Sequence, residues 1–148
     1  MNNQDFLSEL LGIEKLRVTG TEFTGIEQIK LVVESIEAAG ICPDCGQISI
    51  QAHGQAEEQL IRDLAYGERR CYLSYRAHRF RCETCNKTFV ERVVWKRPEV
   101  GYTLRFEQYI FQRARKEPVS QIAEEEGLIE EAVQAIFEHR AKKRLRNG

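Results

Sequence analysis

Four of the five cysteines stand in two pairs, each with two residues between its members. The pairs are Cys42 with Cys45 and Cys82 with Cys85. Thiolates at this spacing can bind one ion from a tight turn, and two such pairs supply the tetrahedral sulfur shell that structural zinc prefers. Gly46 follows the first pair and Asn86 the second, and both residue types tolerate the left-handed backbone that such a turn needs. The pattern predicts one zinc ion without an open coordination position, which makes it structural rather than catalytic.

The separation of the two pairs is longer than in short zinc ribbons. Thirty-six residues lie between Cys45 and Cys82, but lengthening a loop adds little closure entropy. One pair alone would fit a redox motif or chance, whereas two pairs in a small chain without a secretion signal favour zinc. The fifth cysteine, Cys71, falls on the apolar face of a predicted strand and is expected to be a small buried residue. Three histidines are not needed as ligands: His53, His78 and His139.

Charge is distributed in blocks along the chain. The net charge is −1, which alone argues against binding to nucleic acid. Residues 120–138, however, contain six acidic and no basic groups, and residues 140–146 contain five basic and no acidic groups. A partner senses the local field within a Debye length of about 8 Å, so patches of a nearly neutral chain can attract phosphate. The predicted phosphate contacts are Arg70, Arg76, Arg79, Lys96, Arg97, Arg140, Lys142, Lys143 and Arg144.

Residues 119–138 fit the frame of a helix-turn-helix. Ala123 is small where two helices would cross, and Gly127 permits a left-handed turn residue. The apolar residues expected to fill the angle between the helices are Leu128, Val133 and Ile136, with Phe106, Ile110 and Phe137 completing a three-helix core. An ordinary helical hairpin shares some of these needs. Gln134 is the only uncharged candidate for reading base edges, because Glu130 and Glu131 beside it would repel phosphate.

Hydrophobic periodicity predicts an α+β protein, a β-rich zinc ribbon followed by a three-helix helix-turn-helix module. The predicted helices cover 4–13, 102–116, 119–126 and 129–143, and the predicted strands cover 28–37, 48–51, 70–80 and 88–95. Pro98 restricts the residue before it to extended conformations and marks a boundary. We therefore expect two domains, a zinc ribbon with a short N-terminal helix over 1–97 and a helix-turn-helix over 98–148.

Composition excludes several classes of protein. Hydrophobic residues make up 42% of the chain, which argues against wholesale disorder and predicts a modest core. No stretch approaches the about 18 consecutive apolar residues of a membrane helix. The N-terminus has neither a basic segment nor an uninterrupted apolar one, so it does not resemble a signal peptide. We expect a soluble, cytoplasmic protein without a membrane partner.

A string of motifs resembles one protein family. It reads Cys42-Pro-x-Cys45-Gly46, His53-Gly54, Ile61-Arg62-Asp63-Leu64, Arg79-Phe80-x-Cys82-x-x-Cys85 and Phe89-x-Glu91-Arg92, followed by the helix-turn-helix. Over roughly residues 5–140 the chain resembles the N-terminal region of bacterial insertion-sequence transposases of the ISL3 family. The resemblance implies a zinc ribbon and helix-turn-helix that bind double-stranded DNA at terminal inverted repeats during transposition. The second cysteine pair departs from the family, which often has an extra residue between these cysteines.

The expected function is DNA binding without catalysis. Members of the ISL3 family continue into a catalytic domain with three metal-binding carboxylates on an RNase-H-like sheet, which does not fit within 148 residues. We expect no enzyme activity, and a homodimer or a catalytic transposase subunit as a further partner. The rival hypothesis is a zinc-stabilised protein-interaction module or transcriptional regulator that acts through acidic helices. Its candidate side chains are Glu124, Glu125, Glu126, Glu130 and Glu131.

Overall fold

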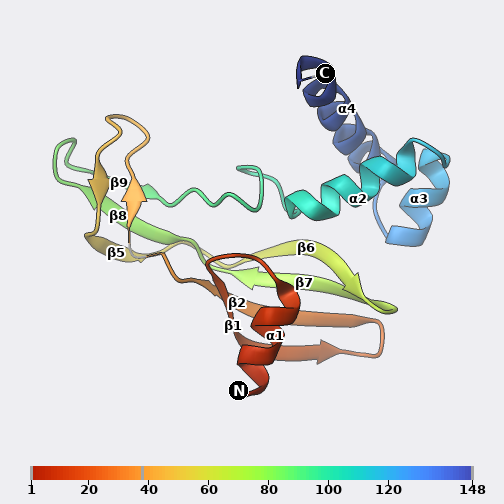
Figure 1. Cartoon of the computed structure of the whole chain (residues 1–148), viewed down its shortest axis with the longest axis horizontal. Coiled ribbons are helices and arrows are strands. Elements are labelled where there is room, and N and C mark those ends of the chain that lie inside the picture. The colour runs from red at the N-terminus through yellow and green to blue at the C-terminus, as the bar shows by residue number, and fades with distance from the viewer. Residues whose placement is uncertain (1, 38, 148) are drawn as a thin grey trace.

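A mixed four-stranded sheet lies at the centre of the fold (Figure 1). The structure is a computed structural model that describes residues 2–37 and 39–147. The strands follow in the order β1 (Leu16–Thr24), β2 (Gln28–Ser35), β7 (Arg69–Tyr75) and β6 (Gln59–Tyr66). β2 and β7 are parallel, and each pairs with its outer neighbour in antiparallel fashion. The α+β class predicted from the sequence is confirmed.

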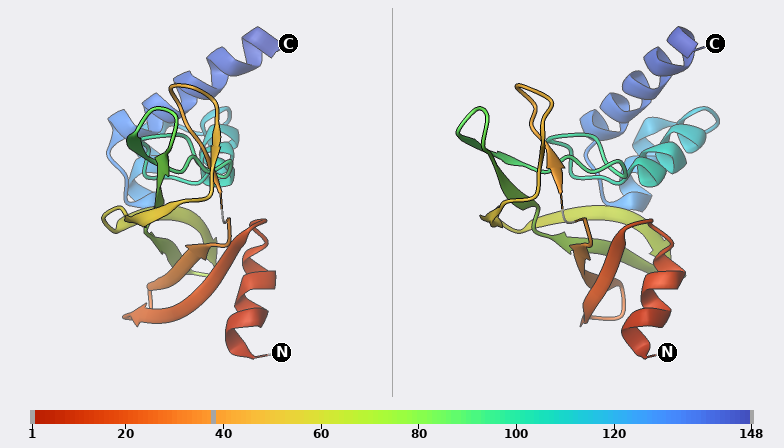
Figure 2. Two further views of the ribbon diagram at one scale, coloured as in Figure 1. Left: turned by 90° about the vertical axis from the view of Figure 1, so that its left-hand side faces the viewer. Right: turned by 60° about the vertical axis from the view of Figure 1, so that its left-hand side comes forward.

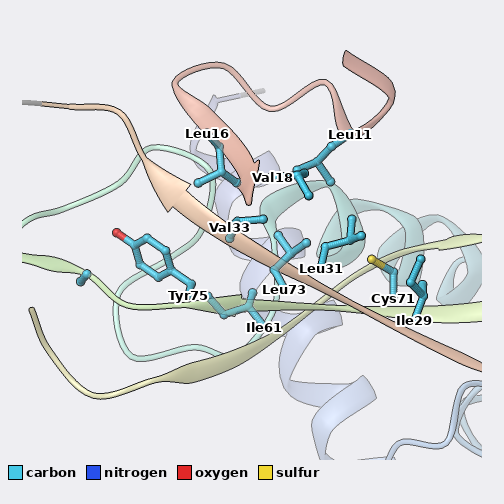
Figure 3. Packing of buried hydrophobic residues seen from close by; sticks show 11 residues of the cluster. Leu11, Leu16, Val18, Ile29, Leu31, Val33, Ile61, Cys71, Leu73 and Tyr75 are labelled. Carbon is cyan, nitrogen blue, oxygen red and sulfur yellow. The ribbon is translucent and has the colours of Figure 1, made fainter. Parts of the chain in front are cut away.

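One face of this sheet carries the main apolar core (Figure 3). Residues of β2 and β7 lie there side by side in register: Ile29 with Cys71, Leu31 with Leu73, and Val33 with Tyr75. All six are buried, as expected for alternate residues of a strand that point to one face. Leu11 from α1 (Asn3–Leu11) and Ile61 from β6 close the cluster. The alternation predicted within 28–37 and 70–80 is therefore confirmed over these strands.

Helix α1 also covers part of the open edge of β1. The Ser8 hydroxyl accepts a hydrogen bond from the Val18 backbone N–H at 2.9 Å, and the Gln4 side-chain amide donates to the Thr19 carbonyl at 2.8 Å. These bonds satisfy edge groups that would otherwise be free to pair with another strand. Leu11 is the buried residue of α1, whereas Phe6 and Leu10 remain 58% and 54% exposed.

Two small sheets form a second unit, residues 40–55 and 78–90, which we call the ribbon. β3 (Gly40–Ile41) pairs with β4 (Ile48–Ser49), and β8 (His78–Cys82) lies between β5 (Ala52–Gln55) and β9 (Lys87–Val90). The single strand predicted over 70–80 is wrong. Strand β7 ends at Tyr75, where the chain leaves the four-stranded sheet. A separate strand, β8, begins at His78 and pairs within the ribbon.

The strand predicted over 88–95 ends at Val90 and is also wrong in its second half. Side-chain anchors fix the segment that follows. The buried Glu91 carboxylate accepts hydrogen bonds from the Tyr75 hydroxyl at 2.6 Å and from the His78 backbone N–H at 2.9 Å. Trp95 then packs edge-on against the Tyr75 ring, with 5.1 Å between the ring centroids. These anchors direct the backbone across the end of β7 rather than along another strand.

Three helices form the remainder, which we call the helical module: α2 (Leu104–Ala114), α3 (Val119–Glu126) and α4 (Glu130–Asn147). The helices predicted over 102–116, 119–126 and 129–143 are confirmed, with ends that differ by a few residues. Figures 1 and 2 place the helical module and the ribbon turns on one side of the four-stranded sheet and α1 on the other. Within the described residues, the helices are too short or too polar to traverse a lipid bilayer.

Candidate metal centre and nucleic-acid interface

The four paired cysteines converge in the ribbon. Cys42 and Cys45 lie in the turn between β3 and β4, Cys82 is the last residue of β8, and Cys85 lies in the turn between β8 and β9. Their sulfur atoms all lie within 4.8 Å of one another. The Cys42 and Cys85 sulfurs are 3.9 Å apart, and the Cys45 and Cys82 sulfurs are 3.5 Å apart. A tetrahedral zinc with Zn–S bonds of about 2.3 Å has sulfur–sulfur edges of about 3.8 Å, so the observed cluster has the size of a zinc site.

Both turns have the same backbone conformation. Gly46 has φ of 76° and Asn86 has φ of 57°, which confirms the left-handed residue predicted after each pair. The Gly46 N–H donates to the Cys42 carbonyl at 2.9 Å, and the Asn86 N–H donates to the Cys82 carbonyl at 2.8 Å. This repeated turn directs both sulfurs of a pair toward the same point.

At one of the four cysteines, Cys82, the backbone favours the thiolate form that a metal requires. The Cys85 N–H points at the Cys82 sulfur at 3.4 Å. This amide donor lowers the pKa of Cys82 to about 7, because a hydrogen bond stabilises the thiolate over the thiol. Cys71 is different: it is fully buried in the main core, and burial raises the pKa of its thiol to about 12. The prediction that Cys71 is a small buried residue is confirmed.

The helical module has the close crossing expected at its turn. Ala123, Val133 and Ile136 are buried together, and Gly127 has φ of 69° between α3 and α4. The Gly127 N–H donates to the Ala123 carbonyl and closes α3. Phe137 differs from the prediction, because it lies only half-buried and stacks on Phe111, 5.4 Å between ring centroids, rather than inside the core.

Two adjacent charged residues of β6 join the sheet to the helical module. Arg62 is 4% exposed and Asp63 is fully buried. The Arg62 guanidinium pairs with Glu126 at 3.0 Å and lies over the Phe106 ring, 4.8 Å from its centroid. The Asp63 carboxylate accepts from Arg105 at 2.6 Å and, with its other oxygen, from the Thr103 hydroxyl. Neighbouring residues of a strand point to opposite faces, so this pair fixes the module from both sides of β6.

The backbone closes the same edge. The Arg62 N–H donates to the Gly101 carbonyl at 2.8 Å, and the Thr103 N–H donates to the Arg62 carbonyl at 3.0 Å. Residues 101–103 therefore act as a short strand beside β6, and Thr103 then caps the start of α2. Sequence reasoning assigned no role to Arg62 and Asp63. Their signal is a pair of opposite charges in the middle of an otherwise apolar segment.

Part of the acidic run of α3 is neutralised inside the chain. Arg113 of α2 forms ion pairs with Glu117 at 2.8 Å, Glu125 at 2.5 Å and Glu126 at 2.9 Å. Such a network is stronger than isolated surface pairs, because one ordered guanidinium serves several carboxylates. The α3 end of the module therefore carries less negative charge than the sequence alone suggested.

Four of the predicted phosphate contacts are engaged within the chain. The Arg70 guanidinium donates to the Glu125 carbonyl at 3.1 Å, and the buried Lys96 ammonium donates to the Arg97 carbonyl at 2.8 Å. Arg97 itself pairs with the fully buried carboxylate of Glu107 at 2.5 Å. The fourth is Arg140, which donates to the Leu104 carbonyl and to the Gln108 side chain. These contacts position the helices against each other and against the sheet.

The other predicted DNA contacts are exposed. They are Arg76, Arg79, Gln134, Lys142, Lys143 and Arg144. Arg76 lies two residues before β8 and Arg79 lies within β8, whereas the other four lie along α4. Sequence reasoning did not select Arg115, which follows α2 and lines a groove together with Arg140, Lys143 and Arg144 of α4. Its distance in sequence from the basic block at 140–146 concealed it.

Two family models match the chain. The zinc-finger of transposase IS204/IS1001/IS1096/IS1165 matches residues 38–85, and the helix-turn-helix domain of transposase family ISL3 matches residues 91–141. The chain belongs to the ISL3 transposase family. Comparison with curated proteins and with solved structures gave no match.

The two ISL3 matches fall on the two candidate sites. The zinc-finger match includes all four clustered cysteines, and the helix-turn-helix match includes α2, α3 and most of α4. The ribbon is thus a zinc ribbon, and its four-sulfur cluster fits zinc as the bound metal. The chain carries the DNA-binding part of an ISL3 transposase. Helix α1 and strands β1 and β2 lie outside both matches.

Proposed function

We propose that this chain recognises the terminal inverted repeats of an insertion element and performs no catalysis itself. The observation that carries the proposal is that exposed cations fall into two sets from two units, the ribbon region and the helical module, whose backbones lie on the same side of the four-stranded sheet (Figure 2). One set consists of Arg76, in the link between β7 and β8, and Arg79, in β8 of the ribbon. The other set, Lys142, Lys143 and Arg144, belongs to the end of α4. Two separated sets suit a duplex, whose phosphates recur along its length.

The pairing of the remaining arginines supports this division. Arg62, Arg97, Arg105 and Arg113 all form ion pairs inside the chain. The five exposed cations of the two sets form no ion pair within residues 2–37 and 39–147. They are Arg76, Arg79, Lys142, Lys143 and Arg144. Unpaired cations keep their full charge for phosphate, so their removal should weaken binding to every duplex alike.

Sequence discrimination needs a group that reaches base edges. We assign it to Gln134, which is exposed on α4 and donates to Glu138 at 3.2 Å. A glutamine can form two hydrogen bonds with adenine in the major groove. The zinc ion supplies no chemistry in this proposal; it holds the two turns of the ribbon together, since four sulfur ligands leave no position for a reactant. Strand transfer would come from a catalytic transposase subunit, and a homodimer would match the two repeats.

Selection from a randomised duplex library tests the proposal. The zinc-loaded chain should enrich one sequence motif over several rounds, whereas Gln134→Ala should bind with similar strength but enrich the motif less. Replacing Lys142, Lys143 and Arg144 together by alanine should weaken binding to motif and non-motif duplexes by the same factor. Enrichment of no motif by the wild-type chain would contradict inverted-repeat recognition.

A second function rests on a different observation. Glu124, Glu130 and Glu131 are exposed and have no cation partner within the described residues. They form an acidic surface at the junction of α3 and α4, which would suit a basic protein partner. If the wild-type chain fails to retard any duplex at low salt, the protein-interaction hypothesis replaces DNA binding, and these three glutamates are the residues to substitute first.

A further inference from the structure

A basic groove lies between α2 and the C-terminal half of α4. Its volume is about 310 Å³. The polar residues that line it are Gln108, Gln112, Arg115, Arg140, Lys143 and Arg144. No carboxylate lines it, and within the described residues its four cations form no ion pair. The groove therefore concentrates positive charge in a space large enough to receive a phosphate group.

Two of the three guanidinium groups in the groove are already held in place. The Arg140 group donates to the Leu104 carbonyl at 2.5 Å and to the Gln108 side chain at 3.2 Å, so it bridges α4 to α2. The Arg115 group lies over the Phe111 ring, 5.9 Å from its centroid. Ordered cations lose less side-chain entropy when they bind an anion than free ones do.

The register of α4 places the other cations on the same side. Arg140, Lys143 and Arg144 stand three and four residues apart, which puts them on one face of a helix. Like charges at this spacing repel each other and destabilise a helix. An anion in the groove would relieve that repulsion.

The N-terminal half of α4 has the opposite charge. Its exposed side chains include Glu130, Glu131 and Glu138, and Gln134 lies among them. Carboxylates near phosphates are repelled, so this half cannot approach a duplex backbone closely. The phosphate-binding character of α4 is thus confined to the half that borders the groove.

We propose that the α2–α4 groove holds one backbone phosphate of duplex DNA, with Arg115 as a contact that completes the set on α4. The proposal rests on the proposed function, since it assumes that the ligand is DNA. It sets the docking of the module: the duplex backbone crosses the C-terminal half of α4, and the acidic N-terminal half meets only the base edges that Gln134 can reach. Arg140 acts as a fixed cation at the groove floor.

The test measures the salt dependence of binding to one labelled duplex by fluorescence anisotropy. The variants are Arg115→Gln, Arg144→Gln and the double variant, and Lys116→Gln is the control. Lys116 is an exposed cation next to Arg115 that does not line the groove. Each neutralised phosphate contributes about −0.9 to the slope of log K against log salt. If both arginines serve one phosphate, each single variant should flatten the slope measurably, and the double variant should flatten it by no more than about 0.9 in total.

The outcomes separate the groove from the wider function. An unchanged slope for Arg115→Gln, or a flattening by about 1.8 in the double variant, would overturn the single-phosphate groove while DNA binding stands. A wild-type chain that binds no duplex would overturn both proposals. Lys116→Gln could also flatten the slope as much as Arg115→Gln does. That result would show that DNA responds to the general positive charge of this surface, and it would overturn the groove proposal. Thermal unfolding of each variant, followed by ellipticity, checks that the fold is intact.

Discussion

Removal of Arg97 offers a direct test of how the helical module is held. Its guanidinium makes a two-pronged contact with Glu107, at 3.0 Å from Nε to Oε1 and 2.5 Å from Nη2 to Oε2. Glu107 is fully buried on α2, whereas the Arg97 side chain is 26% exposed. In Arg97→Ala the carboxylate stays buried and loses its partner. A buried charge without a partner is among the most destabilising features of a protein.

The size of the effect follows from the burial of the carboxylate that remains. Removing one partner of a buried ion pair costs about 3–5 kcal/mol, because the other charge stays buried without compensation. Arg97 is 26% exposed and Lys96 lies close enough to interact with Glu107 by charge, so both water and a second cation reduce the cost. We therefore expect a loss of about 3 kcal/mol in the free energy of unfolding.

Urea unfolding of the zinc-loaded chain, followed by the fluorescence of its single tryptophan, measures this loss. Trp95 suits the purpose, because its carbonyl accepts the Leu104 N–H at 2.8 Å where the module begins. The control Arg92→Ala removes an exposed arginine and should change stability by less than about 0.5 kcal/mol. Substituting Arg97 and Glu107 together by methionine should restore most of the loss. A loss below about 1 kcal/mol would refute this reasoning.

Three further predictions concern the cysteines and one glycine. Cys42→Ser should release the zinc and unfold the ribbon, because structural zinc binding is coupled to folding. Cys71→Ala should retain one zinc per chain. Elemental analysis measures the zinc content of both variants. Burial raises the pKa of Cys71 to about 12, so iodoacetamide at neutral pH should modify this thiol only after unfolding; labelling of the native chain would contradict its burial. Gly127→Ala should destabilise the chain by about 1–2 kcal/mol in urea, because φ is 69° and the new Cβ would lie 2.5 Å from Arg70. Gly25→Ala, with φ of 70° and open space, isolates the backbone strain from that contact.

The sequence predicted the elements whose signals are local. Ile29, Leu31 and Val33 recur at every second position of a segment rich in β-branched residues and identify β2 without reference to the rest of the chain. β6 gave no such signal, because Arg62 and Asp63 interrupt its apolar pattern and are buried only through partners about forty or sixty residues later. The division into domains at residue 97 stays a prediction. The chelation experiment that tests it compares the loss of β structure with the helical ellipticity that remains.

The metal site was more predictable than the DNA surface. The zinc ligands act through fixed spacing within each pair, which the sequence displays directly. A cation, by contrast, binds DNA only if the fold leaves it exposed and unpaired, and Arg97 cannot be distinguished from Arg79 by residue type. Only tertiary contact with Glu107 separates the two. The positions of the DNA contacts therefore remain predictions that depend on the fold.

The contacts of Arg105 limit how chimeras and fragments of this transposase region can be designed. The guanidinium of Arg105, on α2, pairs with Asp63 of β6. It also donates a hydrogen bond to the Leu11 carbonyl at the end of α1, at 2.7 Å. Three segments far apart in the sequence thus meet at one residue, and α1 belongs to the stretch that neither family model covers. A chimera that takes its helix-turn-helix from another ISL3 member must import a matching β6 as well. A fragment trimmed at residue 38 would retain every zinc ligand and yet lose one of the supports that orient its helices.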